Sequence, residues 1–419
     1  MTRDAAQRSR PPCGNWTFYE AVNILYKNSP ADYDMEKKEE EYQGFEQGPI
    51  RPPSEADSLL IRVSRNCPWN RCGFCPVYKG SRFSLRPPEH VKADIDAVYR
   101  CLEKLRSAST RAQTLSRSDL YEIMESLAPA DAPAFQAALR WWNEGRRSVF
   151  LQDANSLIIK PDDLIDILNH LYRRFPDIER VTSYARSHTI CRIKQEKLEQ
   201  IRRAGLNRLH VGMESGSDQV LELAKKGVTK AEHIKAGIKS RQAGFELSEY
   251  VMPGLGGQDL SETHALETAD ALNQINPDFI RLRSLAIPPG LPLHEEYLAG
   301  RFKKCTDIMM AEELLRFLRH LDGINSYLKS DHILNLFEEV EGRLPDDKEK
   351  MMAPVRRFLD MTPADQTLFQ VGRRLGLFRY LRDMNDTDKL NRARAVRDRM
   401  GITPDNVEAV IEEAMNQFI

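Results

Sequence analysis

The sequence predicts an α/β protein built on a partial (β/α)6 barrel of the TIM type, with a helical insertion and a helical C-terminal extension. Six short apolar runs alternate with segments of helical apolar spacing over residues 58–287, and only helical patterns follow Pro288-Pro289-Gly290. Such alternation requires a parallel sheet with crossover helices, and six repeats suit a partial barrel. We therefore expect an N-terminal arm over residues 1–57, the barrel over 58–287 and a helical region over 288–419.

The predicted strands share a short run of β-branched and apolar residues bounded by turn residues. They are residues 59–63, 148–151, 180–184, 207–213, 247–252 and 279–285. Helical spacing occurs between them, most clearly over 88–105, 161–175, 194–204, 229–244 and 261–275. The arm contains a possible short helix at 18–26 and a free thiol, Cys13.

The insertion covers residues 107–147 and is helical but irregular, with breaks at Pro129 and Pro133. Trp141 and Trp142 are consecutive, so on a helix they point to different faces. We expect one or both to pack the insertion on the barrel.

Three cysteines, Cys67, Cys72 and Cys75, lie in a stretch that follows the first strand and is rich in Pro, Asn and Gly. In a β/α barrel, the carboxyl ends of the strands form the active-site face. A sulfur-only ligand set favours iron–sulfur or zinc over harder ions. Three ligands on a [4Fe–4S] cluster would leave one iron open to bind a small molecule.

Other interpretations fit the same spacing. A plant-type [2Fe–2S] protein also has Cys-x4-Cys-x2-Cys with a fourth cysteine further on, for which Cys101 is the candidate. A structural zinc site would also need four ligands. In either case the chain would be an electron carrier or a structural metal protein, although Cys101 falls inside a predicted helix, where a core position is the simpler interpretation.

The cysteine pattern, with Phe74 just before the last cysteine, resembles the cluster motif of the radical S-adenosylmethionine (radical SAM) superfamily. That family usually has three residues between the first two cysteines, whereas this chain has four, Pro68 to Arg71. The resemblance covers residues 59–285 and is nearest to the branch with the tRNA methylthiotransferases, the Elongator catalytic subunit and the anaerobic coproporphyrinogen oxidases. It implies a [4Fe–4S] cluster on Cys67, Cys72 and Cys75, and an enzyme that reductively cleaves S-adenosyl-L-methionine (SAM) to a 5′-deoxyadenosyl radical. It also implies a one-electron donor such as flavodoxin or ferredoxin.

The same resemblance suggests cofactor contacts at the ends of the first three strands. Phe74 accompanies the cluster ligands. Asp153 and Asn155 occupy the position of the family's glycine-rich segment, which meets the amino group of SAM. Arg186 could pair with the cofactor's carboxylate through two parallel hydrogen bonds, or it could simply be solvated.

Two later strand ends complete the expected cofactor site. Glu214-Ser215-Gly216 is similar to the segment that binds the ribose hydroxyls, with an ordinary helix N-cap and an exposed acid as the alternative. Gly254 belongs to a segment that resembles the one flanking the adenine. No residue is indicated for chemistry on the substrate, and the substrate itself is not identified.

Composition restricts the partners. The formal charge is −1, from 61 basic and 62 acidic residues, so nucleic acid is not an expected partner. The seven cysteines form no disulfide-like framework, which together with a thiolate-bound cluster favours a cytoplasmic location. The first residues have no signal-peptide pattern, and no run approaches the roughly 18 apolar residues of a membrane span.

Overall fold

The computed structural model describes residues 41–109 and 115–416. The chain divides between Glu41 and Tyr42, and the account below concerns the unit from Tyr42 onward. The predicted helix over residues 18–26 and Cys13 lie outside the described residues. No helix of the described part is long and apolar enough to cross a membrane.

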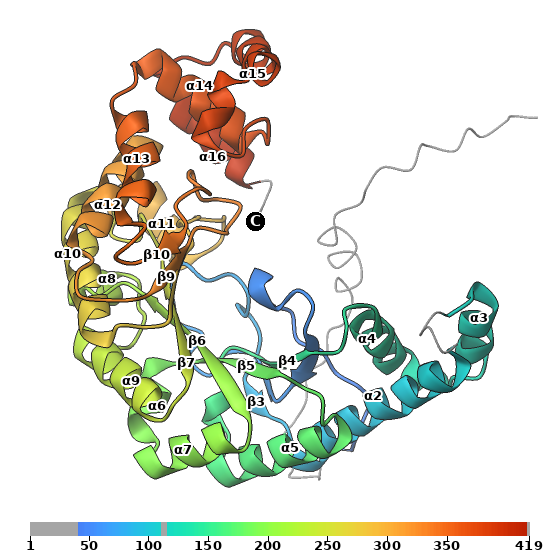
Figure 1. The fold of residues 1–419 in the computed structure, drawn as a ribbon. Helices are drawn as coiled ribbons and strands as arrows, with labels where there is room; N and C mark the ends of the chain where they lie inside the picture. The colour runs from blue at the N-terminus through green and yellow to red at the C-terminus, as the bar shows by residue number, and fades with distance from the viewer. Residues whose placement is uncertain (1–40, 110–114, 417–419) are drawn as a thin grey trace, which may run out of the picture. The chain divides into compact units, whose positions relative to one another are not determined.

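An eight-stranded sheet forms the centre of this unit (Figure 1), in the order β1-β4-β5-β6-β7-β8-β9-β10. All neighbours run parallel except the last pair, β9 and β10. The strands are β1 (Leu59–Arg62), β4 (Ser148–Gln152), β5 (Arg180–Ala185), β6 (Leu206–Glu214), β7 (Glu246–Val251), β8 (Phe279–Leu282), β9 (Tyr327–Lys329) and β10 (Gly342–Arg343). The first six match the six predicted strands, so the expected α/β barrel-type fold is confirmed.

Helices connect the parallel strands along one face of the sheet (Figure 1). They are α2 (Pro88–Ala108), α3 (Arg117–Glu125), α4 (Ala132–Asn143), α5 (Pro161–Arg174), α6 (Ser187–Arg192), α7 (Gln195–Arg203), α8 (Asp218–Leu223), α9 (Lys230–Gln242) and α10 (Gly257–Ile275). The amphipathic spacing that predicted α2 and α5 buries their apolar stripes, Val91, Ile95 and Val98 in α2 and Leu164, Ile167 and Leu171 in α5. Thr229 and Glu232 form a capping box at the N-terminus of α9.

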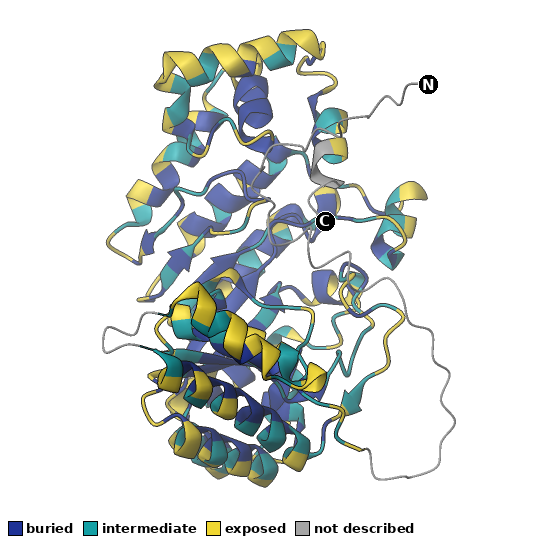
Figure 2. Ribbon diagram, turned by 90° about the vertical axis from the view of Figure 1, so that its right-hand side faces the viewer, coloured by how far each residue is buried: buried dark blue, intermediate teal, exposed yellow. Residues whose placement is uncertain are grey.

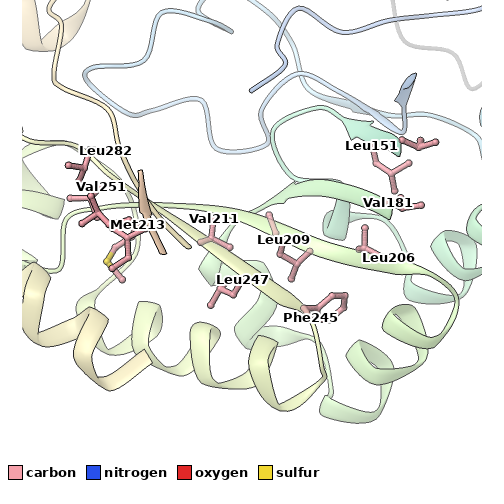
Figure 3. Close-up of a cluster of buried hydrophobic side chains, with 14 of the residues drawn as sticks. Leu151, Val181, Leu206, Leu209, Val211, Met213, Phe245, Leu247, Val251 and Leu282 are labelled. Atoms are coloured by element: carbon pink, nitrogen blue, oxygen red, sulfur yellow. The ribbon is translucent and has the colours of Figure 1, made fainter. Parts of the chain in front are cut away.

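The main core lies between the sheet and these helices (Figures 2 and 3). Alternate residues of each strand, such as Leu209, Val211 and Met213 on β6, are fully buried in it. Trp141 is 2% exposed and packs edge to face on Phe175, with ring centroids 5.1 Å apart. The insertion is therefore held on the barrel helices by this tryptophan, as expected.

The opposite face of the strands is polar and aromatic. Tyr184 on β5 and Tyr250 on β7 both pack against His210 on β6, with ring centroids 5.9 and 5.6 Å away. At the amino ends of the strands, the short helix η1 (Pro53–Glu55) places Glu55 in the barrel with its side chain fully buried. Burial alone would raise the pKa of Glu55, but hydrogen bonds from His210 and Ser58 and the charge of Arg180 lower it to about 2. At this end of the barrel the Glu55 carboxylate is therefore satisfied by its neighbours, while Arg180 Nε and His210 Nδ1 have no hydrogen-bond partner among the described residues.

The C-terminal region differs from its prediction in one respect. Helices were expected throughout, but β9 and β10 extend the sheet beyond the sixth predicted strand. Both are too short, at three and two residues, to show a period-two pattern. The predicted helices are present as α11 (Pro292–Leu298), α12 (Asp307–His320), α13 (Lys348–Leu359), α14 (Pro363–Arg374), α15 (Thr387–Arg399) and α16 (Val407–Asn416).

Candidate active site

The cysteine loop, residues 66–83, is held in place without helix or strand of its own. Strands β2 (Ser64–Arg65) and β3 (Ser84–Leu85) pair antiparallel and close the loop at its base. Three hydrogen bonds tie its middle to segments that follow β6 and β8: Gly73 N–H to Ala224 O (2.9 Å), Leu293 N–H to Gly73 O (3.1 Å) and Trp69 Nε1–H to Lys225 O (2.8 Å). The loop therefore lies at the carboxyl ends of the strands.

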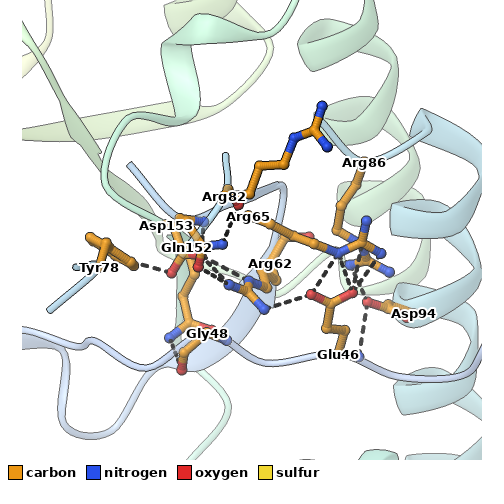
Figure 4. Close-up of polar contacts among 11 residues, drawn as sticks. Glu46, Gly48, Arg62, Arg65, Tyr78, Arg82, Arg86, Asp94, Gln152 and Asp153 are labelled. Atoms are coloured by element: carbon orange, nitrogen blue, oxygen red, sulfur yellow. Dashed lines mark hydrogen bonds and ion pairs between the residues drawn. The ribbon is translucent and has the colours of Figure 1, made fainter. Parts of the chain in front are cut away.

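Asp153 anchors both ends of the cysteine loop (Figure 4). Its fully buried carboxylate follows β4. Oδ2 accepts from Arg62 Nε (2.8 Å) and Asn66 N–H (2.9 Å), and Oδ1 accepts from the Tyr78 hydroxyl (3.1 Å). Burial raises the pKa of Asp153, against the charge of Arg62 and these three bonds. Arg62 in turn donates to Glu46 (2.6 Å), so the network extends into the segment before β1.

The three thiols are half-buried and lie near enough to influence one another's charge. Asn70 N–H donates to Cys67 Sγ (3.4 Å), and the backbone N–H of Val77 donates to Cys75. Burial raises the pKa of Cys72 and of Cys75, and the charge of each ionised neighbour would raise it further. Cys72 and Cys75 also pack on the apolar cluster that contains Phe74.

Two cations face these thiols. Lys226 Nζ lies 3.1 Å from Glu214 Oε1 and 5.8 Å from the centroid of the Phe74 ring. Arg186 Nη2 donates to Lys226 O (2.8 Å), and its guanidinium lies 5.0 Å from the centroid of Trp69. Burial lowers the pKa of Arg186, while the charges of Cys67 and Cys72, when ionised, oppose that shift. Burial would also lower the pKa of Lys226, but Glu214 and an ionised Cys72 raise it.

The backbone around Glu214 brings its carboxylate to the carboxyl ends of the strands beside the cysteine loop, a region that we call the mouth. The β6–β7 register shifts between Gly212 and Glu214, and Glu214 has φ +65°, in the left-handed region. A Cβ on Gly212 would collide with the Glu214 carboxylate and lie 3.1 Å from Lys226 Nζ. A side chain at position 212 would therefore require the Glu214 carboxylate to move.

The donor set fits an iron–sulfur cluster. Within residues 41–109 and 115–416, no three His, Cys, Asp or Glu side chains gather closely enough to hold one metal ion. A [4Fe–4S] cluster instead takes one thiolate on each of several irons, so its ligands stand farther apart than those of a single ion. Three thiols on one loop with two backbone N–H donors and two facing cations suit an anionic sulfur cluster.

A comparison with known families identifies the chain. The sequence profile of the Radical SAM superfamily matches residues 61–269, about half of the chain, from β1 into α10. The chain belongs to the radical SAM superfamily. Its matched region contains all three cysteines, Arg186, Glu214 and Lys226.

Individual relatives of this radical SAM protein are distant. The tRNA uridine(34) acetyltransferase of Methanocaldococcus jannaschii is 24% identical over 110 residues, which are 26% of this chain and 20% of that protein. Similar solved structures include Elp3 of Methanocaldococcus infernus with an N-terminal deletion (15% identity, TM-score 0.37, 50% of this chain and 55% of that one). Another is the coproporphyrinogen III oxidase HemN of Escherichia coli (16% identity, TM-score 0.40, 63% and 52%). The chain thus matches a fifth of its curated relative's length.

The other expected cofactor residues of this radical SAM protein are bonded within the fold. Asn155 donates to Thr189 Oγ1 (2.8 Å) and accepts from Arg186 N–H (3.1 Å), so it shapes the start of α6. The fully buried Ser215 bonds to His264 Nδ1 (2.8 Å), away from the cysteine loop. Gly254, with φ +85°, donates its N–H to the buried Glu313 (2.8 Å).

Cys101, the candidate fourth ligand, lies elsewhere. It is 3% exposed in the main core, whereas Cys72 and Cys75 border the separate apolar cluster around Phe74. The charged groups nearest to it are Asp131, Lys104 and Arg100. The fold therefore does not bring Cys101 to the other three cysteines, which agrees with the core interpretation of its helical position.

Sequence reasoning missed Lys226 and Trp69. Lys226 follows α8 in the run Lys225-Lys226-Gly227, and Gly227 has φ +66° where a Cβ would collide with the Trp69 ring. A glycine closing a short helix beside two lysines was the available signal. It predicts a helix end but not that the lysine turns toward the cysteines.

Proposed function

We propose that this chain is a radical SAM enzyme in which Cys67, Cys72 and Cys75 hold a [4Fe–4S] cluster with one iron open to SAM. The observation that carries the proposal is that three thiols on one loop face the cations Arg186 and Lys226 at the carboxyl ends of parallel strands. When bound, such a cluster supplies the electron that cleaves SAM to a 5′-deoxyadenosyl radical.

The mouth residues bind and orient the cofactor in this proposal. Lys226 and Arg186 supply the positive charge for the carboxylate of SAM, and Arg186 can do so through paired N–H groups. Glu214 uses only Oε1 toward Lys226 among the described residues. Its second oxygen is available to accept from the ribose hydroxyls. Phe74, 9% exposed, keeps the cluster side of the mouth apolar and excludes water.

Asp153, Asn155, Ser215 and Gly254 act as positioning residues in this scheme. Each of them forms hydrogen bonds to other residues of the protein, as described above. Asp153 fixes the two ends of the cysteine loop, and Asn155 fixes the backbone N–H of Arg186. We therefore expect their substitution to disturb cluster loading or Arg186 before it disturbs any direct contact with SAM.

The substrate is proposed to be other than a nucleic acid. The M. jannaschii relative is named for tRNA, but this chain carries a net charge of −1, and its later helices mix both signs. Filter binding of tRNA should show no tight complex. Micromolar affinity that falls steeply with salt would contradict this expectation, because phosphate neutralisation produces that slope.

Anaerobic reconstitution tests the central proposal. The wild-type chain should take up about four irons. With dithionite, or with flavodoxin or ferredoxin as one-electron donor, it should release 5′-deoxyadenosine from SAM. Cys72→Ala is the matched control and should do neither. A fully loaded wild-type protein that releases no 5′-deoxyadenosine would refute the proposal.

A further inference from the structure

A second cavity lies at the amino ends of the strands, away from the cysteine loop. Its volume is about 190 Å³, and it is bounded by α2, by the turn after α4 and by the turn between α5 and β5. Arg147 and Glu179, which line it, directly precede the first residues of β4 and β5. Figure 1 shows α2 running past both α4 and α5. The proposed cofactor site occupies the opposite ends of these strands.

The turn after α4 holds an arginine in this cavity. Arg146 has φ +57°, follows Gly145 with φ +81°, and donates its backbone N–H to Trp141 O (3.1 Å). The next residue, Arg147, accepts through its carbonyl from Glu179 N–H (2.9 Å), which joins this turn to the one before β5. The position of Arg146 is therefore fixed by backbone geometry at a conformation that few residues other than glycine and asparagine adopt readily.

Four arginines line the cavity, and one of them forms no ion pair. Three are paired: Arg106 with Glu103 (2.6 Å), Arg147 with Glu179 (3.6 Å) and Arg174 with Asp96 (2.6 Å). Among the described residues Arg146 has no carboxylate within ion-pair distance, and its guanidinium lies 4.5 Å from the centroid of Trp142. Burial lowers the pKa of Arg146 and the like charge of Arg106 lowers it further, against the smaller opposing effect of Asp177. The cavity thus holds a cation that is free to pair with an anion.

The inner wall of the cavity is apolar. Trp141 and Phe175, which pack edge to face, line it and are 2% and 8% exposed.

We propose that this cavity binds a phosphate monoester whose organic part rests on the Trp141–Phe175 wall. The charge of Arg146 favours an anion, and the Arg guanidinium group matches phosphate oxygens in pairs. A volume of about 190 Å³ is smaller than a pocket for a whole drug-sized ligand. It therefore accommodates the phosphate group and part of a ring, with the remainder in solvent.

Calorimetric titration tests the proposal, with 5′-AMP, adenosine and inorganic phosphate as probes. The wild-type protein should bind 5′-AMP at least tenfold more tightly than adenosine, and more tightly than inorganic phosphate. Arg146→Gly, which tolerates the positive φ, should weaken 5′-AMP binding by at least tenfold.

Arg203→Ala on α7 is the matched control, since Arg203 is an exposed arginine outside the cavity with a side chain 68% exposed. It should bind 5′-AMP as the wild type does, and thermal unfolding should show all variants folded. No wild-type binding of 5′-AMP at millimolar concentration would overturn the proposal. So would equal affinity for 5′-AMP and adenosine, or binding that Arg146→Gly leaves unchanged, which would place the nucleotide at the cysteine mouth.

Discussion

The two ends of the barrel strands handle buried charge differently. At the amino ends, the buried Glu55 carboxylate accepts hydrogen bonds from Ser58 and His210 and pairs with Arg180. At the carboxyl ends, the cations Arg186 and Lys226 lie near Glu214 and the thiols, and the buried Glu249 adds a second carboxyl whose pKa burial raises well above its usual range. In the function proposed above, the first network stabilises the fold and the second set binds an anionic sulfur cluster and a cofactor carboxylate.

The largest expected effect is the loss of cluster loading at the mouth, which should leave the rest of the fold intact. Replacing any one of Cys67, Cys72 or Cys75 by alanine should abolish cluster uptake, because no other described cysteine lies near enough to substitute. Iron and sulfide content after reconstitution measures this. Cys101→Ala should load like the wild type, and loss of its chromophore would instead support the four-cysteine site.

Glu55→Gln probes the network at the amino ends. The pKa of Glu55 is lowered to about 2 in the folded protein, from 4.5, so its contribution to stability is present above pH 4.5 and is lost as the pH falls toward 2. We expect the substitution to lower the free energy of unfolding at neutral pH by about 3 kcal/mol. Urea unfolding measures the change. Iron content should stay at the wild-type level in the folded variant. A large loss of iron with little loss of stability would show that Glu55 at the amino ends of the strands affects the cluster site at the carboxyl ends, against this account.

Asp153→Asn tests whether the cysteine loop depends on the hydrogen bonds and the ion pair that Asp153 forms with Arg62, Asn66 and Tyr78. The substitution would leave Arg62 without one of its two carboxylates, at a cost on the order of 2 kcal/mol in stability. It should also release both ends of the cysteine loop and reduce the iron retained after gel filtration. Retained iron with a selective loss of SAM affinity would assign Asp153 to direct cofactor binding instead.

Lys226→Met should act more on cofactor binding than on cluster loading. Removing this cation should weaken SAM binding roughly tenfold, about 1.4 kcal/mol, with a smaller reduction in iron content, because Lys226 also lies near Cys72. Calorimetry on the reconstituted protein measures the affinity, and Lys230→Met on α9, whose partner is the exposed Asp270, is the matched control. Glu214→Gln should weaken SAM binding to a similar extent if Glu214 holds the ribose; unchanged affinity with lost turnover would make it a substrate residue.

A further effect concerns the protonation of a buried histidine, His233, behind the mouth. His233 hydrogen-bonds to Ser187, and burial together with the charges of Lys226 and Arg186 lowers its pKa to about 3. The unfolded chain binds a proton near pH 6.5 while the folded one does not, so stability should fall as the pH drops below 6.5. Between neutral pH and about pH 5 we expect roughly 1–2 kcal/mol from this residue, absent in His233→Gln. Identical pH profiles by urea unfolding would contradict the assignment.

The parts of this molecule that follow repeating patterns were predictable from sequence. Six strands, their connecting helices and the position of the cysteines after β1 follow from apolar periodicity and from the rule that parallel strands end at one face. The same rule predicts that Arg186 and Glu214 lie near the thiols, and both influence the charge of Cys72. The rule does not decide which way a side chain points at a strand end, and the Ser215 hydroxyl bonds to His264. The cofactor contacts of these residues stay predictions.

Features set by single backbone conformations were not predictable. Lys226 lies beside Gly227, whose positive φ allows the Trp69 ring to approach closely, and Arg146 lies in a turn with positive φ beside the cavity at the amino ends. Neither depends on a repeating pattern. The Glu55 network at the amino ends likewise depends on a contact across 155 residues of sequence. Such features need the three-dimensional arrangement before they can be argued.

The most direct test of the central claim is the electron paramagnetic resonance spectrum of the reduced, reconstituted protein with and without SAM. If the cysteine loop leaves one iron open and the mouth residues bind the cofactor beside it, adding SAM should change the spectrum of the wild-type cluster. The same concentration should change it much less in Lys226→Met. A fully loaded wild-type protein whose spectrum is unaltered by saturating SAM would contradict the account.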